Sequence, residues 1–237
     1  MKTHEVFPTL VVQDRIDVHE EFKEQHFEEL KSLWYKPNSR GEWTHQTPEN
    51  SGRCSLHLNP DYLRFFQSLK RSVCKYLDLL EVDHEKLDIN IIKSWVGYHN
   101  KDIPQLNMHS HNGADISFTY YLSSDETSDK FCVHQLTNTN EVAGALFEPS
   151  DRFNVMKKFN RYNCNNYTIT PHEGTVVIFP STLQHSTLKK QNISDRYTIP
   201  GDIKLCLKPE YNLYHQSIPH PDLWLSISEI KKKWHKK

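Results

Sequence analysis

The sequence predicts an α+β protein that is mainly β, in which an antiparallel sandwich or barrel carries helices packed on one sheet. Within the first 86 residues, two segments repeat apolar residues at three- and four-residue steps, as amphipathic helices do. After Leu87 the pattern changes to short runs rich in β-branched and aromatic residues, which is typical of strands. Helices followed by a series of short strands favour this class over one in which helices and strands alternate.

The two helices are expected at residues 17–34 and 60–80. In the first, apolar side chains at helical spacing stand among Glu and Lys residues. In the second, Asn59 can cap the N-terminus and Pro60 suits the first helical turn. The apolar face of the second helix is expected to pack in the core and comprises Leu63, Phe66, Leu69, Val73, Leu77 and Leu80.

The clearest strand is the apolar run GTVVIFPS at residues 174–181. A short run at 145–149 is a further candidate strand, and residues 228–237 are expected to be helical or frayed. The polar segments 40–53 and 138–166 are expected to be lids over the mouth of the barrel, and their partly basic content favours an anionic or amino-acid-like substrate. The other expected strands lie at residues 5–16, 87–100, 114–123, 130–136 and 196–207.

Composition argues against several classes of protein. The chain has 29 Lys and Arg against 30 Asp and Glu, which gives no support for broad binding to nucleic acid or an anionic membrane. No run approaches the ~20 apolar residues needed to cross a bilayer. The 5 cysteines form no CxxC pair and are expected to be reduced thiols. We therefore expect a cytoplasmic protein with a small-molecule substrate and no nucleic-acid or membrane partner; its oligomeric state is not predicted.

Two histidines and an aspartate stand close together in the run QLNMHSHNGADIS. His109 and His111 are two residues apart, so they project from the same face of an extended strand. Asn112 and Gly113 form a turn signal, and Asp115 begins the next strand. Two His and one carboxylate are a common ligand set for a redox-active Fe(II) site, although an isolated HxH is more often a solvated strand end.

A second cluster lies further along the chain. His185 follows the clearest strand after a short loop, and Arg196 begins the next apolar run. A buried arginine needs an anionic partner because an unpaired buried charge is costly. That partner is either an internal acid, with Asp202 and Glu173 as candidates, or the carboxylate of a ligand, which the planar guanidinium can bind through two hydrogen bonds.

Together, the segments SWVGYHN, HSHNGADISFTYYL, HEGTVVIFPSTLQHS and DRYTI resemble the 2-oxoglutarate/Fe(II)-dependent oxygenase superfamily. The sequence looks most similar to its prolyl-hydroxylase-like and aspartyl-hydroxylase-like branch of small phage and bacterial proteins. The resemblance implies a double-stranded β-helix, a cupin-like jelly roll with the metal between its sheets. It also implies a single domain over residues 1–237, with a helical N-terminal part (1–86), a jelly-roll core (87–210) and a C-terminal extension (211–237).

The same resemblance implies an oxidoreductase of the dioxygenase type. It would use Fe(II), 2-oxoglutarate and O2, and would release succinate and CO2. Hydroxylation of a small, amino-acid-like or anionic substrate is the implied reaction, and halogenation, desaturation and cyclisation stay open. His185 resembles the distal iron ligand, and Arg196 with Thr198 resembles the pair that holds the far carboxylate of 2-oxoglutarate. The aromatic residues that either line the pocket or pack in the core are Trp95, Tyr98, Tyr120 and Tyr121.

The proximal iron ligands are open to three interpretations. The family usually shows His-x-Asp, whereas this chain has His109-x-His111 followed by Asp115. We rank His111 with Asp115 first, because it keeps two His and one carboxylate. The other sets are His109 with His111, which makes the centre all-histidine, or His111 as the single proximal ligand.

Two other functions are compatible with these residues. A non-oxidative cupin-like metalloprotein, such as an isomerase or hydrolase that holds Zn or Mn, would use the same histidines and would not need Arg196. A non-catalytic jelly-roll binding protein would need no metal, so substitution of His111 and His185 would change neither metal content nor ligand binding.

Overall fold

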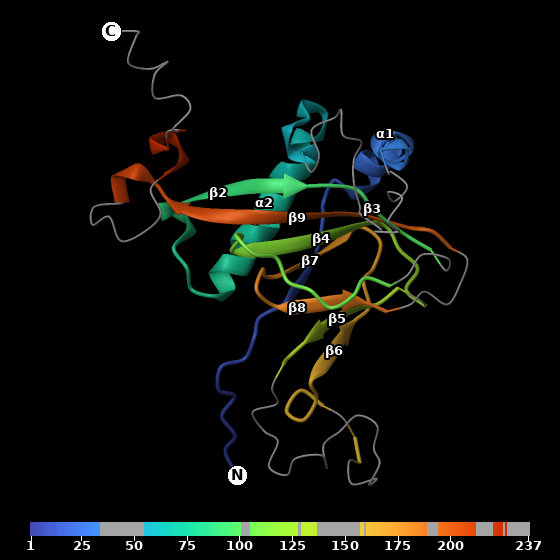
Figure 1. Cartoon of the computed structure of the whole chain (residues 1–237), viewed down its shortest axis with the longest axis vertical. Helices are drawn as coiled ribbons and strands as arrows, with labels where there is room; N and C mark the ends of the chain where they lie inside the picture. The colour runs from blue at the N-terminus through green and yellow to red at the C-terminus, as the bar shows by residue number, and fades with distance from the viewer. Residues whose placement is uncertain are drawn as a thin grey trace.

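Two antiparallel β-sheets form the body of the structure (Figure 1). The computed structural model describes residues 1–33, 55–100, 105–127, 129–136, 157–158, 160–188, 194–211, 220–224 and 226. Its strands are β1 (Val12–Arg15), β2 (Leu87–Ser94), β3 (Gly97–His99), β4 (Ile116–Ser123), β5 (Phe131–His134), β6 (Asn166–Ile169), β7 (Thr175–Pro180), β8 (Gln184–Thr187) and β9 (Arg196–Leu207). Its α-helices are α1 (His19–Ser32) and α2 (Leu63–Leu79), and 3-10 turns lie at Leu56–Leu58, Pro60–Tyr62, His84–Lys86, Pro209–Tyr211 and Pro221–Leu223.

The two sheets face each other across a small apolar layer. The larger sheet has the order β1-β7-β4-β9-β2, with β3 also paired to β9, and the smaller sheet has the order β6-β5-β8. Tyr121 and Phe179 of the larger sheet pack with Phe131 of the smaller one, and the rings of Phe131 and Phe179 lie 5.1 Å apart. This arrangement confirms the expected fold class, a mainly β jelly roll with N-terminal helices.

The strands at the centre of the larger sheet separate a polar face from an apolar one. Successive side chains of a strand point to opposite faces, so alternate residues of β9 share an environment. Arg196 and Thr198 line the pocket between the sheets. Tyr197 and Ile199 lie in the main hydrophobic core on the other face. The period-two pattern of β9 therefore places the candidate ligand-binding side chains opposite the core.

The N-terminal helices cover the apolar face of the larger sheet, and α2 crosses its strands (Figure 1). Phe22 of α1 stacks on Phe65 of α2 with ring centroids 4.6 Å apart, and Phe65 contacts Tyr120 of β4 at 4.7 Å. Burial of each such aromatic side chain contributes about 1.5–3 kcal/mol. The helices thus stabilise one face of the sheet and leave the other face to the pocket.

The predicted helix at residues 60–80 is confirmed, with small differences at its ends. It begins as a 3-10 turn, and the side chain of Asn59 accepts a hydrogen bond from the backbone N–H of Asp61 at 3.0 Å. Leu63 and Leu80, predicted to pack in the core, are 57% and 45% exposed because they lie at the two ends of the helix. The predicted packing residues that are buried are Phe66, Leu69, Val73 and Leu77.

The strand expected at 87–100 is interrupted at Trp95, which leaves two strands, β2 and β3. Pro200 of β9 lies opposite this break, and the backbone N–H of Trp95 donates to its carbonyl at 3.1 Å. Proline has no N–H to return a ladder hydrogen bond, so the pairing stops and resumes at Gly97 opposite Thr198.

Other differences concern the outer strands. The sequence analysis does not predict β6 or β8; β6 is short and mostly exposed, and β8 begins at Gln184, at the end of the loop expected before His185. The strand expected at 5–16 is reduced to β1. The segments 40–53, 145–149 and 228–237 lie outside the described residues, as does most of 138–166.

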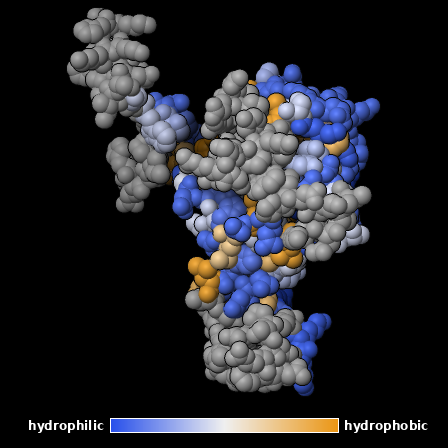
Figure 2. All heavy atoms as spheres, turned by 45° about the vertical axis from the view of Figure 1, so that its right-hand side comes forward, coloured by the Kyte–Doolittle hydropathy of each residue, from blue (hydrophilic) through white to orange (hydrophobic). Residues whose placement is uncertain are grey.

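The described surface is largely polar. Figure 2 shows a mostly hydrophilic face with small, separate hydrophobic patches. No helix in the described part of the chain combines the length and the apolarity that a bilayer-spanning segment needs.

A buried histidine links α1 to the larger sheet. His19 is 2% exposed, and its Nδ1 lies 2.6 Å from the hydroxyl of Tyr120. Its Nε2 lies 3.5 Å from a carboxylate oxygen of Glu173. The next residue, Gly174, has φ of +80°, and a Cβ there would lie 2.8 Å from the His19 ring, so both backbone conformation and space require glycine.

We expect His19 to make the protein less stable in mild acid. Burial lowers the pKa of His19, against the opposing charges of Glu20 and Glu173, so the unfolded chain binds this proton more readily than the folded chain. The free energy of unfolding should therefore fall as the pH drops through about 6.5. In urea unfolding, His19→Gln should remove up to about 1.4 kcal/mol per pH unit of this dependence, the equivalent of one proton. The same pH dependence in the variant and the wild type would contradict this role.

Candidate metal centre

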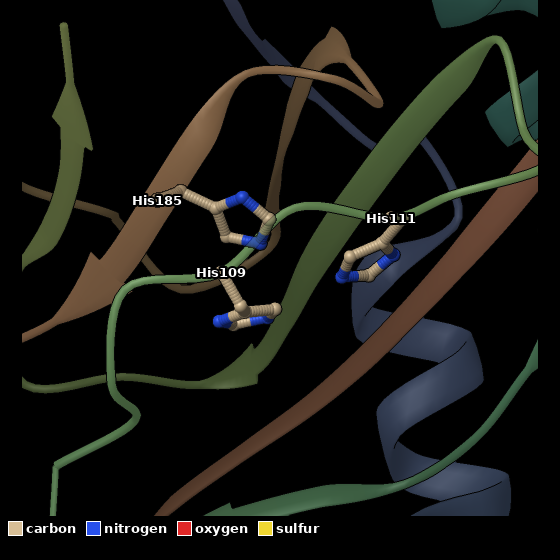
Figure 3. Close-up of side chains that lie close together, drawn as sticks. All are labelled: His109, His111 and His185. Carbon is tan, nitrogen blue, oxygen red and sulfur yellow. The ribbon is translucent and has the colours of Figure 1, made fainter. Parts of the chain in front are cut away.

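Three histidines converge between the two sheets (Figure 3). One ligand nitrogen from each of His109, His111 and His185 lies within 4.8 Å of the other two. The ring centroids are 4.3 Å apart for His109 and His185, 5.1 Å for His111 and His185, and 5.3 Å for His109 and His111. Three imidazoles this close together can bind one metal ion.

Backbone hydrogen bonds bring the HxH segment to β8. The N–H of His109 donates to the carbonyl of His185 at 2.9 Å, and the N–H of His185 donates back to His109 at 2.8 Å. Two residues on, the N–H of His111 donates to the carbonyl of Ser181 at 2.9 Å. As the spacing predicts, His109 and His111 project to the same side, and the pairing with β8 places His185 beside them.

The hydrogen-bond partners of the three rings determine which nitrogen is free. The Nδ1 of His109 lies 2.7 Å from the carbonyl of Asn107, and that of His185 lies 2.9 Å from the carbonyl of Leu183. The Nδ1 of His111 lies 2.5 Å from a carboxylate oxygen of Asp202. Because these oxygens accept hydrogen bonds, each Nδ1 carries the proton and each Nε2 keeps its lone pair. All three rings therefore have the tautomer that leaves Nε2 available to a metal.

Burial also favours the neutral form of two of these rings, those of His109 and His185. It lowers the pKa of His185 to about 4, and it lowers the pKa of His109. A neutral imidazole is the form that binds a metal ion, so His109 and His185 need not lose a proton to do so near neutral pH.

Asp115 does not join this cluster, which corrects the ligand set that we ranked first. One oxygen of its carboxylate pairs with Nζ of Lys204 at 2.8 Å, and the other accepts the backbone N–H of Leu205 at 2.8 Å. After the turn at Gly113 the chain runs alongside β9, whose Lys204 and Leu205 bind the carboxylate there. Among the described residues, the cluster is all-histidine and contains no carboxylate.

The histidines line one pocket, which holds about 530 Å³ of empty space, part of it open to solvent. Arg196, Thr198 and Tyr98 also line it, and lining of a pocket was one of the two alternatives for Tyr98. A Cβ on Gly97, opposite Thr198 in the sheet, would lie 2.4 Å from the threonine hydroxyl, so glycine leaves that hydroxyl its place. Lining residues that the sequence analysis did not single out are His99, Leu106, Thr119, Phe131, Ser186, Thr187 and Pro200.

The predicted aromatic substrate contacts have different positions. Tyr120 is fully buried in the core beneath the helices and does not reach the pocket, which corrects that expectation. Its neighbours Thr119 and Tyr121 line the pocket instead, as strand alternation requires. Trp95 is not among the lining residues, but its ring lies 6.1 Å from that of His111.

Arg196 is buried, and the acid that faces it is not one of the two predicted. Its guanidinium lies 3.6 Å from a carboxylate oxygen of Asp129, and the exposed side-chain fractions are 5% and 0%. The other oxygen of Asp129 accepts the backbone N–H of Asp125 at 2.7 Å and the hydroxyl of Ser124 at 3.2 Å. Asp129 is therefore held in place by its own loop and compensates the charge of Arg196.

The two acids that were candidates for Arg196 have other partners. Glu173 pairs with Lys23 and His19 on the helical side of the larger sheet. Asp202 binds His111 and also pairs with Nζ of Lys93 at 2.8 Å. The period of two along β9 places Asp202 on the same face as Arg196. This pattern could have identified Asp202 from the sequence as a residue near the site.

The donor set fits a divalent transition metal. Imidazole nitrogens suit Fe, Zn, Cu and Ni, whereas Mg and Ca prefer oxygen ligands. Three protein ligands leave further coordination positions for a substrate or cosubstrate, as catalytic centres require.

The comparison with protein families finds a match within this chain. Residues 93–202 match the family described as "Putative 2OG-Fe(II) oxygenase". The matched segment contains the three histidines, Arg196 and Thr198. No curated protein matches this chain.

The solved structures to which this chain is similar are distant in sequence. The epimerase SnoN, in complex with Fe3+, alpha ketoglutarate and nogalamycin RO, is 11% identical over 92% of this chain and 88% of that chain, with a TM-score of 0.51. HygX from Streptomyces hygroscopicus, with nickel and 2-oxoglutarate bound, is 13% identical over 83% of each chain, with a TM-score of 0.47. The viral collagen prolyl hydroxylase vCPH from Paramecium Bursaria Chlorella virus-1 is 11% identical over 88% of this chain and 97% of that chain, with a TM-score of 0.43.

The likeness to SnoN agrees with the jelly-roll fold, and the family match agrees with the resemblance seen in the sequence. Residues 93–202 of this chain therefore match the family of 2-oxoglutarate/Fe(II)-dependent oxygenases, the superfamily that the sequence motifs resemble.

Proposed function

We propose that this chain is a dioxygenase that uses Fe(II), 2-oxoglutarate and O2 to hydroxylate, or otherwise oxidise, a small molecule, with release of succinate and CO2. The observation that carries the proposal is a single pocket lined by His109, His111 and His185 and by the buried Arg196. The three imidazoles would hold the iron, and the guanidinium would bind the far carboxylate of 2-oxoglutarate.

The charges of the pocket suit this pair of ligands. Neutral histidines leave the full double positive charge on the metal, and 2-oxoglutarate carries two carboxylates. Arg196 is already balanced by Asp129, so the metal and the cosubstrate would balance each other. A buried site with no large net charge avoids the cost of an uncompensated ion.

Arg196 and Thr198 are the residues proposed to bind the far carboxylate. They lie two residues apart on the pocket face of β9, and both side chains are at least nine-tenths buried. Asp129 lies on one side of the guanidinium and limits its freedom to rotate. A fixed planar guanidinium can bind a carboxylate through two hydrogen bonds with little further loss of entropy.

The remaining lining residues restrict water. Phe131 and Tyr121 are fully or almost fully buried beside the histidines, so this part of the pocket is apolar. When bound, Fe(II) and 2-oxoglutarate supply the oxidising chemistry with O2. The protein's part is to hold both, to position the substrate and to keep bulk water away from the reaction.

We propose Tyr98 and Trp95 as contacts of the substrate. Tyr98 lines the pocket, and the half-buried ring of Trp95 lies beside His111. An amino-acid-like or anionic substrate is supported by the basic residues of the sequence segments 40–53 and 138–166.

We propose that residues 1–237 are a single domain in the cytoplasm. The core beneath the helices continues into β4 and β9, which supports one unit for 1–86 and 87–210; residues 211–237 would be an extension. In the described part of the chain, the cysteines that form no disulfide are Cys74, Cys132, Cys164 and Cys206. Free thiols agree with a reducing compartment.

The all-histidine donor set also favours a second candidate, a non-oxidative metalloprotein such as an isomerase or hydrolase. Three histidines and a water molecule are a known ligand set of catalytic zinc. Such a protein would have no need of a buried arginine near the metal, so binding of 2-oxoglutarate separates the two functions.

Anaerobic titration of the full chain with Fe(II) and 2-oxoglutarate tests the proposed function. Chelation of Fe(II) by a 2-oxoacid produces a weak charge-transfer band in the visible spectrum, and we expect this band to appear and saturate. We also expect 2-oxoglutarate to raise the melting temperature when Mn(II) replaces Fe(II). A folded, iron-loaded protein without the band would contradict the oxygenase proposal, and tight Zn(II) binding with no response to 2-oxoglutarate would favour the second candidate.

The ligand set can be tested separately by two substitutions. We expect His109→Ala to weaken Co(II) binding by at least tenfold, because it removes one of three ligands. Asp115→Asn should leave Co(II) binding unchanged, since the carboxylate is bound by Lys204 and Leu205. Competition titration against a chromophoric chelator measures both. The reverse result would restore Asp115 as a ligand.

Arg196 can be tested through the affinity for 2-oxoglutarate. We expect Arg196→Met to weaken its binding by about 1.5–3 kcal/mol, as for a lost hydrogen bond to a charged group, and to leave Co(II) affinity unchanged. The substitution leaves Asp129 buried without a counter-ion, so the matched variant is the double substitution Arg196→Met with Asp129→Asn. That variant should fold and still bind 2-oxoglutarate weakly. Wild-type affinity in the double variant would remove Arg196 from this role.

A further inference from the structure

We propose that Asp202 is a positioning residue of the metal centre, which orients His111 and keeps the imidazole proton on Nδ1 so that Nε2 faces the metal. This inference rests on the metal-binding part of the proposed function and not on 2-oxoglutarate.

The geometry of the contact supports this role. A carboxylate oxygen of Asp202 lies 2.5 Å from Nδ1 of His111, which is a short hydrogen bond between a ring N–H and a carboxylate. Asp202 is fully buried, and the side chain of His111 is 11% exposed, so water competes little for either partner. The contact therefore holds the ring in one orientation.

Three donors keep the Asp202 carboxylate ionised and fixed. The oxygen that faces His111 also accepts the hydroxyl of Ser117 at 2.6 Å. The other oxygen pairs with Nζ of Lys93 at 2.8 Å. These two hydrogen bonds and the ion pair with Lys93 compensate the charge of the buried carboxylate and fix its orientation. An ionised carboxylate can only accept hydrogen bonds, so Nδ1 of His111 must donate.

His111 differs from the other two histidines in its partner. His109 and His185 donate to backbone carbonyls, which keep their positions as long as the fold does. His111 alone of these three depends on a side chain, and that side chain carries a negative charge. A carboxylate behind a ligating histidine makes the ring a stronger donor to the metal. The cluster of three histidines therefore contains no acid. The carboxylate of Asp202 contacts one of these histidines, His111, from behind.

The substitution Asp202→Asn gives a sharp test because Lys93 determines how the new amide must turn. The ammonium group of Lys93 can only donate, so the amide oxygen is expected to face Lys93 and the NH2 group to face His111. An NH2 group forces Nδ1 of His111 to accept, which moves the ring proton to Nε2, the nitrogen that would bind the metal. The same change in tautomer is known for the aspartate of a catalytic triad.

Metal binding and ring tautomer are measured separately in the full chain. We expect Asp202→Asn to weaken Co(II) binding by about 10–100-fold, the usual effect of removing a residue that orients a metal ligand. Asp115→Asn is the matched control, because Asp115 also pairs with a lysine at 2.8 Å and lies outside the cluster, and it should bind Co(II) as the wild type does. In the double variant Asp202→Asn with Lys93→Met, the amide is free to turn its oxygen towards His111, so part of the affinity should return.

Nitrogen-15 NMR of the histidine rings in the metal-free chain gives a readout that needs no metal. The signal of His111 is assigned by its loss in His111→Gln. We expect wild-type His111 to be protonated on Nδ1, with a ring proton shifted far downfield, and we expect its tautomer to change in Asp202→Asn.

If Asp202→Asn does not fold, a wild-type His111 protonated on Nε2 overturns the inference by itself, and Nδ1 protonation supports it. Equal Co(II) affinity in Asp202→Asn and the wild type would also overturn it. Failure of the wild type to bind Co(II) would contradict the proposed function, while the NMR result would still decide the tautomer.

Discussion

The site depends on the position of three ring protons. Each histidine of the cluster donates its Nδ1 proton to a fixed acceptor, and only then do three Nε2 lone pairs become available in one place. Two of these acceptors are backbone carbonyls close in sequence to their histidines, so the local chain conformation fixes both the ring and its tautomer. The third acceptor comes from β9, far along the chain. The metal centre is thus formed only when the larger sheet is complete.

β9 connects the stability of the protein to its chemistry. One face of this strand packs Tyr197 and Ile199 beneath the helices, and the other presents Arg196, Thr198 and Asp202 to the site. A shift of one residue in the register of β9 would move charged side chains into the core and apolar ones into the pocket. A register shift of one residue would therefore cost free energy on both faces of the strand. The register of β9, and with it the position of the site residues, is strongly determined.

Much of this arrangement can be predicted from the sequence, because its strongest signals are local. Periodicity predicts α1, α2 and the central strands β4, β7 and β9, and the HxH spacing predicts two side chains on one face. The predictions fail where the outcome depends on pairing between distant segments. Asp115 is close to His111 in sequence, yet Lys204 and Leu205 bind its carboxylate on β9. The sequence analysis misses β6 and β8 because each has only 4 residues, too few for a clear pattern, and both pair with β5.

The same limit applies to partners of buried charges. The sequence shows that Arg196 needs an acid, and charge alone cannot choose among acids spread along the chain. Asp129 is the partner because its loop carries it to the start of β9 and holds it with Asp125 and Ser124. Tyr120 was misplaced for a simpler reason: it alternates with Thr119 and Tyr121, and the sequence does not say which set faces the helices.

The ion pair of Asp129 and Arg196 also affects which anions the pocket admits. A lone buried guanidinium would attract chloride, phosphate or any small carboxylate from the cell. Here the neighbouring acid cancels most of that attraction at long range, so a distant anion is attracted only weakly, while the short-range hydrogen bonds of the guanidinium are kept. Only a molecule that reaches a second anchor elsewhere in the pocket can recover the cost of leaving water. If Arg196 binds the cosubstrate as proposed, the enclosed acid would make the pocket discriminate against small free anions.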